Sequence, residues 1–125
     1  MFGNKTAIAT IAVKDLSVAR KFYEGKLGLE PSGSGDSQEV VSYKAGNSSL
    51  LVYRSQYAGT NKATGATWPV DDVEGTAEAL KAKGVTFEHY QFPGSSLKGD
   101  VHIIGAIRTA WFKDPDGNIH SIVNK

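Results

Sequence analysis

Residues 111–122, WFKDPDGNIHSI, bring together side chains that could do chemistry. Asp114, Asp116 and His120 are close in the sequence, and a carboxylate beside an imidazole is a common pair for general acid and base catalysis. Pro115 and Gly117 lie between them. Proline presets φ for a turn, and glycine accepts the positive φ that closes a bulged hairpin. We therefore interpret this stretch as a hairpin turn and expect both carboxylates to be exposed rather than catalytic.

The other two histidines, His89 and His102, also fall in the second half of the chain. His102 lies in or beside residues 91–105, which we interpret as a long loop that forms a lid or the rim of a pocket. This position makes His102 a possible catalytic residue, as a proton carrier or a hydrogen-bonding contact, with Asp100 as a nearby carboxylate. His89 is expected at an exposed edge of a strand. The spacing of the histidines does not predict a cluster.

The composition limits the class of protein. A chain of 125 residues buries roughly two-thirds of its unfolded surface, which is enough for one stable core. Its 14 basic and 13 acidic residues give a net charge of +1, so no charge excess favours a nucleic acid or an anionic membrane as a partner. The absence of cysteine excludes disulfides and thiolate chemistry. No segment approaches the ~20 apolar residues that span a bilayer. We expect a soluble, cytoplasmic protein with a single domain.

The elements that must position these residues repeat along the chain. The segments VKDL (13–16) and VDDV (70–73) each end a predicted strand and begin a predicted helix. Asp15 and Asp72 are suited to accept hydrogen bonds from the first helical N–H groups. Gly28 and Gly84 follow the two helices, where a left-handed residue commonly ends a helix.

The two halves also end alike. YKAGNSSLLV (43–52) is similar to FKDPDGNIHSIV (112–123), and both are typical of a hairpin turn followed by a final strand. Each half is therefore predicted to be a βαβββ module. We expect an α+β fold in a single domain, residues 1–125, with module one at residues 5–58 and module two at residues 63–125.

The sequence resembles the vicinal oxygen chelate superfamily, which holds glyoxalase I, extradiol dioxygenases, fosfomycin resistance enzymes and bleomycin resistance proteins. The similar segments are VKDLSVARKFYEGKLGLE near the start, VDDVEGTAEALKAKGV at the opening of the second half, and WFKDPDGNIHSI near the end. The resemblance implies that two βαβββ modules form a curved mixed sheet around a cavity. It also implies a homodimer.

The resemblance further implies where a divalent metal would be held. Family ligands lie on each opening strand, seven residues before the helix-capping aspartate, and three residues after the asparagine of each final turn. Those positions in this chain are Ile8, Gly65, Leu50 and Ser121. Hydrocarbon, glycine and a lone serine hydroxyl are poor ligands for such a metal. We therefore expect no metal and no other cofactor.

Strand alternation predicts which side chains face the cavity. Ile11, Val13, Trp68 and Val70 should point to the helices. His120 should also face the helices, because it is one residue out of phase with Ser121. The opposite face is mostly apolar with a few polar groups, as small-molecule pockets usually are. The predicted ligand-binding residues are Thr10, Leu50, Val52, Arg54, Thr67, Phe92, His102, Arg108, Trp111 and Ser121.

Three functions fit this pattern. The first is a metal-independent small-molecule binder, similar to bleomycin resistance proteins, that sequesters a hydrophobic toxin or metabolite. The second is a glyoxalase-like lyase or isomerase, or a relative of the dioxygenases, with an altered site. The third is an interaction domain without a ligand, whose apolar face is covered by its own side chains or by a partner.

Overall fold

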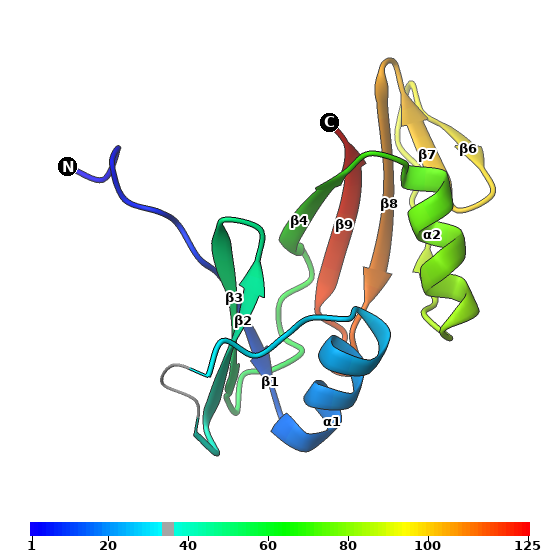
Figure 1. The fold of residues 1–125 in the computed structure, drawn as a ribbon. Coiled ribbons are helices and arrows are strands. Elements are labelled where there is room, and N and C mark those ends of the chain that lie inside the picture. Colours follow the sequence, from blue (N-terminus) through cyan, green and yellow to red (C-terminus); the bar gives the residue numbers. More distant parts are fainter. Residues whose placement is uncertain (34–36) are drawn as a thin grey trace.

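The computed structural model describes residues 1–33 and 37–125, which form two similar units, each with a sheet covered by helices on one face (Figure 1). The first sheet is built from the first half of the chain and the second sheet from the second half. Among the described residues, no helix has both the length and the apolar character needed to cross a membrane.

Module one contains a strand, a helical segment and a hairpin. Its elements are β1 (Ala9–Val13), α1 (Leu16–Arg20), the π-helical turn η1 (Lys21–Lys26), β2 (Val40–Ala45) and β3 (Ser48–Arg54). The strand order is β1-β3-β2, with β1 parallel to β3 and β2 antiparallel to it. A single bridge from Pro31 to Tyr43 stands where the second strand of a βαβββ module is expected.

Module two repeats this plan with an added hairpin. Its elements are β4 (Thr64–Val70), α2 (Val73–Ala82), β5 (Phe87–Glu88), β6 (Ser96–Lys98), β7 (Val101–Ile104), β8 (Ile107–Lys113) and β9 (Ile119–Asn124). The strand order is β4-β9-β8-β7-β6, and the short β5 also pairs with β8. The prediction of a long loop at residues 91–105 was wrong in this respect: most of it is the β6–β7 hairpin, which extends the sheet, and His102 lies on a strand.

The predicted helix signals are confirmed in both modules. Asp15 accepts hydrogen bonds from the backbone N–H groups of Ser17 and Val18, and Asp72 accepts one from Gly75. Gly28 and Gly84 have φ values of +72° and +88°, the left-handed conformation that lets a helix end without strain.

The core lies between each sheet and its helices. On β1 and β4 the side chains of Ile11, Val13 and Ala66 are buried and Trp68 is half-buried, as the alternation predicts. Phe22 and Tyr23 of η1 pack onto this layer, and Val73 and Ala77 of α2 cover the second sheet. The sheet faces away from the helices are less covered. We call these faces, taken together, the open face.

The α+β prediction with two mixed-sheet modules is confirmed, with a further difference in how the strands are joined. The strands form two sheets rather than one continuous sheet. The edge strands β1 and β4 lie next to each other but share no ladder. A bulge in β4 around Gly65 brings its backbone close to β1, since a methyl group at Gly65 would lie 3.2 Å from Cδ1 of Ile11.

Candidate functional site

The carboxylate and imidazole that drew attention in the sequence belong to a buried structural chain. Trp68 donates its indole N–H to Nδ1 of His120 at 3.1 Å. Nε2 of His120 therefore carries the ring proton and donates it to the Tyr23 hydroxyl at 2.9 Å. That hydroxyl in turn donates to Oδ2 of Asp114 at 2.7 Å. The chain links η1 of module one to β4 and β9 of module two.

Burial sets the charge state of this chain. His120 is completely buried, and burial lowers its pKa to about 4, although the Asp114 carboxylate acts in the opposite direction. Burial raises the pKa of Tyr23 well above its ordinary value, and the charge of Asp114 raises it further. The imidazole is therefore neutral and the phenol keeps its proton at neutral pH. The prediction that His120 faces the helices is confirmed.

The expectation that Asp114 is exposed was wrong. Its side chain is buried, and Oδ1 accepts hydrogen bonds from the backbone N–H groups of Asp116 and Asn118. The amide of Asn118 donates both to Oδ2 of Asp114 and to the carbonyl of Ala12 in module one. Asp114 thus organises the turn and helps to hold the two modules together, so its role is structural.

The open face of module two carries an aromatic cluster formed by Tyr90, Phe92, His102 and Trp111. The centroid of the His102 ring lies 4.8 Å from that of Trp111 and 6.0 Å from that of Phe92. Phe92 stacks on His102, whereas Trp111 meets it edge to face. Three of these residues, Phe92, His102 and Trp111, were predicted as ligand contacts. Tyr90 was missed, because no alternation pattern covers the irregular segment after β5.

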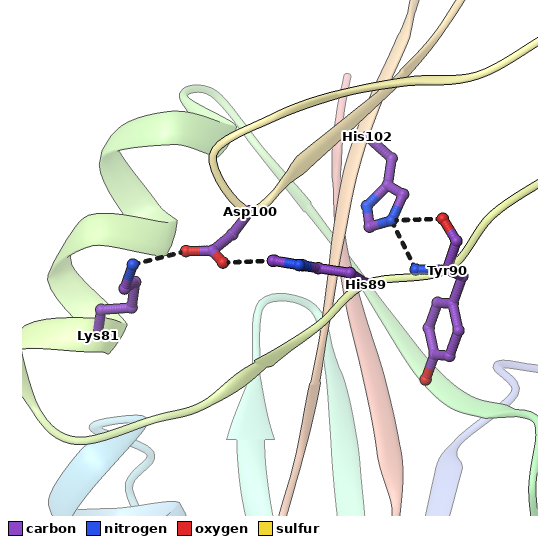
Figure 2. Close-up of polar contacts among 5 residues, drawn as sticks. All are labelled: Lys81, His89, Tyr90, Asp100 and His102. Atoms are coloured by element: carbon purple, nitrogen blue, oxygen red, sulfur yellow. Dashed lines mark hydrogen bonds and ion pairs between the residues drawn. The ribbon is translucent and has the colours of Figure 1, made fainter.

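His102 is nearly fully buried and bound to the backbone of Tyr90 (Figure 2). Nε2 of His102 lies 2.9 Å from the Tyr90 N–H group and 3.1 Å from the Tyr90 carbonyl oxygen. One ring nitrogen cannot accept and donate at once, and the N–H group is the closer partner. Nε2 is then the acceptor, and the ring proton resides on Nδ1.

Two polar atoms in the cluster have no hydrogen-bond partner in the described part of the chain. They are Nδ1 of His102 and the hydroxyl oxygen of Tyr90, and both are shielded from solvent. Buried polar atoms without partners are rare in proteins, because each one forfeits its hydrogen bond to water. A bound molecule would supply such partners.

The Asp100 carboxylate makes no hydrogen bond to His102 in the described part of the chain. It instead bridges two exposed side chains, with Oδ1 2.8 Å from Nε2 of His89 and Oδ2 2.9 Å from Nζ of Lys81 (Figure 2). The hydrogen bond from His89 is the main cause that lowers the pKa of Asp100, and Lys81 adds to it. His89 is exposed, as predicted. This ion-pair bridge ties the β6–β7 turn to α2.

Two of the predicted contacts, Thr67 and Ser121, are neighbours on the open face in the β4–β9 ladder. Ser121 donates its hydroxyl proton to Oγ1 of Thr67 at 3.0 Å. Trp111 is the neighbour of Ser121 across the β8–β9 ladder, so the aromatic cluster adjoins this pair. Thr10 lies on the open face of module one, where it is exposed.

Four predicted contacts do not lie on the open face. Leu50 and Val52 are buried in the core, and Arg54 shares their phase on β3, where it ion-pairs with Glu39 at 3.4 Å. The reason is the length of the turns: two residues join β2 to β3, whereas five join β8 to β9. The residue three positions after Asn47 therefore faces the helices, whereas the residue three positions after Asn118 faces the open side. Arg108 faces α2.

Arg108 has a partner on that helix. Its Nε donates to the Glu74 carboxylate at 2.7 Å, and this hydrogen bond is the main cause that lowers the pKa of Glu74. Arg108 alternates with Thr109 and Trp111 along β8, so it points away from the aromatic cluster. The two arginines among the predicted contacts, Arg54 and Arg108, therefore do not offer their charge to a ligand on the open face.

The residues do not fit a divalent metal at the family positions. With the corrected strand phase, the positions on the open face are held by Ile8, Leu51, Thr64 and Ser121. Two of these are hydrocarbons, and the hydroxyls of Thr64 and Ser121 are in hydrogen bonds to Trp111 and Thr67. Across residues 1–33 and 37–125, no three His, Asp or Glu side chains are grouped closely enough to hold a metal ion.

A groove of about 370 Å³ separates the β2–β3 hairpin from β4. Its lining includes Leu50 and Thr67 of the predicted contacts, together with small residues such as Ala9, Gly46 and Ala66. The groove therefore brings together one predicted residue from each module, although the aromatic cluster is not part of it.

The comparisons with known proteins agree with the fold. A family model described as the Glyoxalase/Bleomycin resistance protein/Dioxygenase superfamily matches residues 5–120. A lactoylglutathione lyase from Agrobacterium tumefaciens is 20% identical with a TM-score of 0.70, covering 97% of this chain and 93% of its own. A genomically encoded fosfomycin resistance protein from Listeria monocytogenes is 16% identical with a TM-score of 0.67, covering 100% and 93%.

A third similar structure is a superfamily member from Sphaerobacter thermophilus, 24% identical with a TM-score of 0.65 and full coverage of both chains. At these identities the likeness shows the fold alone. No curated protein matches the chain.

Proposed function

The chain belongs to the Glyoxalase/Bleomycin resistance protein/Dioxygenase superfamily, and from this premise we propose that it binds a hydrophobic small molecule without the help of a metal. The binding site is the aromatic cluster on the open face of module two, together with Thr67 and Ser121. Binding sequesters a toxin or metabolite without changing it, as the resistance proteins named in the superfamily suggest.

The observation that carries this proposal is the pair of unpartnered polar atoms in the aromatic cluster. Nδ1 of His102 and the Tyr90 hydroxyl are buried among apolar rings and have no partner within the described chain. An N–H group in this state lacks an acceptor, which a ligand oxygen would provide. A site built from aromatic walls with a few fixed polar groups is typical of small-molecule pockets.

The same arrangement indicates the chemistry of the ligand. Trp111 and Phe92 pack edge to face with ring centroids 6.0 Å apart, and an aromatic surface of this kind suits contact with a flat apolar group. His102 then donates to a carbonyl or ether oxygen on that group. Phe92 belongs to the turn before β6 and is half-buried, so its ring must shift for the ligand to reach His102.

We also propose that two copies of the chain pair through the open face. Large apolar or aromatic side chains are exposed on this face in both modules: Ile8, Tyr53, Leu97 and Ile107 are each exposed by 38% to 52%. Exposed apolar side chains on both modules support an interaction surface on this face. Two-fold pairing would cover these side chains and enclose the ligand site.

No observation favours the enzyme alternative. One form of that hypothesis has His102 act with nearby carboxylates such as Asp100, but the Asp100 carboxylate binds His89 and Lys81 instead. His102 has its Nε2 occupied by the Tyr90 backbone. We therefore do not propose a reaction for this site.

A thermal-unfolding screen tests the proposal. Hydrophobic antibiotics and small α-oxo compounds are added to protein dialysed against EDTA, and again after addition of Zn²⁺, Mn²⁺ or Ni²⁺. A ligand should raise the melting temperature equally in both series, since binding to the folded state alone stabilises it. Trp111→Ala should abolish the shift, and Tyr57→Ala, which changes an exposed aromatic residue without a ring contact to the cluster in the described structure, should retain it. A shift that appears only with added metal would contradict the proposal.

A further inference from the structure

A second groove lies on the helix side of the second sheet, between the end of η1 and α2. Its inner part has a volume of about 190 Å³ and is lined almost entirely by apolar side chains. Phe112 and Ile122, both buried, belong to its lining, as do the half-buried Leu29, Trp68 and Leu80. This groove is separate from the open face, because the side chains of Phe112 and Ile122 point to the opposite side of the sheet from Trp111 and Ser121.

The groove continues outward to two lysines. Its outer part has a volume of about 530 Å³ and shares Leu27, Thr76 and Leu80 with the inner part, so the two adjoin. The outer part is also lined by Lys26 from η1 and by Lys83, the residue that ends α2. The groove is thus apolar inside and cationic at one end.

The two lysines carry charge without a counterion in the described structure. Neither Lys26 nor Lys83 takes part in an ion pair within residues 1–33 and 37–125. A methyl group at Gly84, the residue after Lys83, would lie 3.5 Å from Nζ of Lys26, so this ammonium lies just beyond the C-terminal end of α2. The carboxylate in the same groove, Asp72, is at the other end of α2, where it accepts a hydrogen bond from Gly75.

We propose that this groove binds a small amphipathic carboxylate, with its carboxylate between Lys26 and Lys83 and its apolar chain in the inner part. An apolar chamber suits a hydrocarbon, and unpaired ammonium groups suit an anion. The inner volume of about 190 Å³ has room for roughly six groups of methylene size, taking about 30 Å³ for each. The ligand is therefore a medium-chain alkyl or a single-ring aryl carboxylate.

The tryptophans of the chain make the test specific to this groove. The chain has two tryptophans, Trp68 in the groove and Trp111 in the aromatic cluster. Their indole N–H signals can be followed separately by NMR while sodium octanoate is added. We expect a saturable shift of the Trp68 signal with the Trp111 signal unchanged, and no saturable shift with octylammonium.

Matched variants test the carboxylate position. Lys26→Gln and Lys83→Gln should each weaken octanoate binding by at least about tenfold, the size expected when a charge-assisted hydrogen bond is lost. Lys21→Gln, an exposed lysine of η1 outside the groove, should leave the affinity unchanged. Thr76→Phe should block the groove and abolish the shift, with the unfolding temperature as the check that this variant folds.

Each other outcome overturns the inference. A Trp68 signal that does not move at millimolar octanoate excludes the ligand class. Equal binding of octanoate and octylammonium would show that the ligand's carboxylate does not lie between Lys26 and Lys83. Wild-type affinity in both lysine variants would show the same. A shift confined to Trp111 assigns the binding to the open face. A Trp68 shift on dilution of the protein alone shows that a second copy of the chain occupies the groove.

Discussion

His120 is a buried side chain that the fold holds in its neutral form. Its Nδ1 accepts from Trp68 and its Nε2 donates to Tyr23, so both ring nitrogens are in use in the neutral form. A proton added to Nδ1 would point at the Trp68 N–H group and break that hydrogen bond. The imidazole has no contact with solvent that could compensate.

This dependence predicts loss of stability in mild acid. Burial lowers the pKa of His120 to about 4 in the folded chain, against 6.5 in the unfolded chain. The unfolded state binds the proton more readily. The stabilisation of the folded state by neutral His120 is therefore complete above about pH 6.5 and is lost as the pH falls to about 4. The difference between these two pKa values corresponds to a change of about 3 kcal/mol in the unfolding free energy.

The measurement is urea unfolding at pH 7.0 and at pH 4.5, for the wild type and for His120→Gln. The loss of unfolding free energy between the two pH values should be smaller in the variant by about 2–3 kcal/mol. Carboxylates contribute alike to both proteins, so the comparison isolates His120. An equal loss in the two proteins would contradict this account of the buried chain.

At the scale of residues, the sequence predicts which way His120 points but not what it binds. Alternation from Ser121 sets the face, and alternation is a local property. The burial of Asp114 depends on Tyr23, far away in the chain, and on a carbonyl of β1 in the other module. The spacing of residues 111–122 carries no information about partners that come from distant segments. The sequence alone therefore suggests that this turn is exposed.

At the scale of elements, the connector between the modules rests against the β8–β9 turn. Gly59 in this connector has a φ of +82°, and a methyl group there would lie 2.8 Å from the carbonyl oxygen of Asp116. Asp116 also accepts a hydrogen bond from the backbone N–H of Lys14. The turn that resembles a catalytic cluster in the sequence is thus a contact point for module one and the connector.

Gly59→Ala should therefore destabilise the fold more than an alanine at a left-handed glycine with free space. Gly94 is the matched control, with a φ of +79° and no atom within 4 Å of the place that a methyl group would take. Both variants incur the cost of a left-handed alanine, and only Gly59→Ala adds a clash with backbone. We expect the unfolding free energy of Gly59→Ala to be lower by roughly 1–3 kcal/mol than that of Gly94→Ala. Equal stabilities would show that the connector is free to move away.

The β6–β7 hairpin is held to α2 by the bridge through Asp100. Asp100→Asn removes the charge that Lys81 and His89 share, and we expect local opening of the hairpin to increase. Amide hydrogen exchange in β7 should accelerate by about fivefold, while the global unfolding free energy falls by less than about 1 kcal/mol.

The control for the hairpin is Glu39→Gln, which removes an ion pair to Arg54 with both side chains more than half exposed. That variant should leave exchange in β7 unchanged. If amide hydrogen exchange in β7 of the Asp100→Asn variant is as slow as in the wild type, backbone pairing alone holds the hairpin.

The elements that carry local signals were predictable, and the rest were not. Caps at Asp15 and Asp72 and left-handed glycines are set by one or two residues, and they were predicted correctly. The phase of β3 was not, because it depends on the length of its turn, and the repeat suggested a turn like that of the other module. The β6–β7 hairpin resembles a loop in the sequence, because its glycines and serines mask two short strands.

At the scale of the whole molecule, the two sides of the sheets have different chemistry. The helix side holds the core, the buried chain around His120 and the groove that ends at Lys26 and Lys83. The open face holds the aromatic cluster, with two polar atoms that have no partner among residues 1–33 and 37–125, and the exposed apolar side chains. The family positions for a metal carry no ligand of the kind that a divalent ion prefers.

The most direct test of metal-independent binding is calorimetric titration of EDTA-dialysed protein with a hydrophobic compound found to raise its melting temperature. The account predicts one binding event per chain, with the same dissociation constant after Zn²⁺, Mn²⁺ or Ni²⁺ is added. It also predicts that Trp111→Ala weakens binding by at least about tenfold, since a large aromatic contact surface is removed. Binding that requires one of these metals, or that survives Trp111→Ala unchanged, would contradict the central claim.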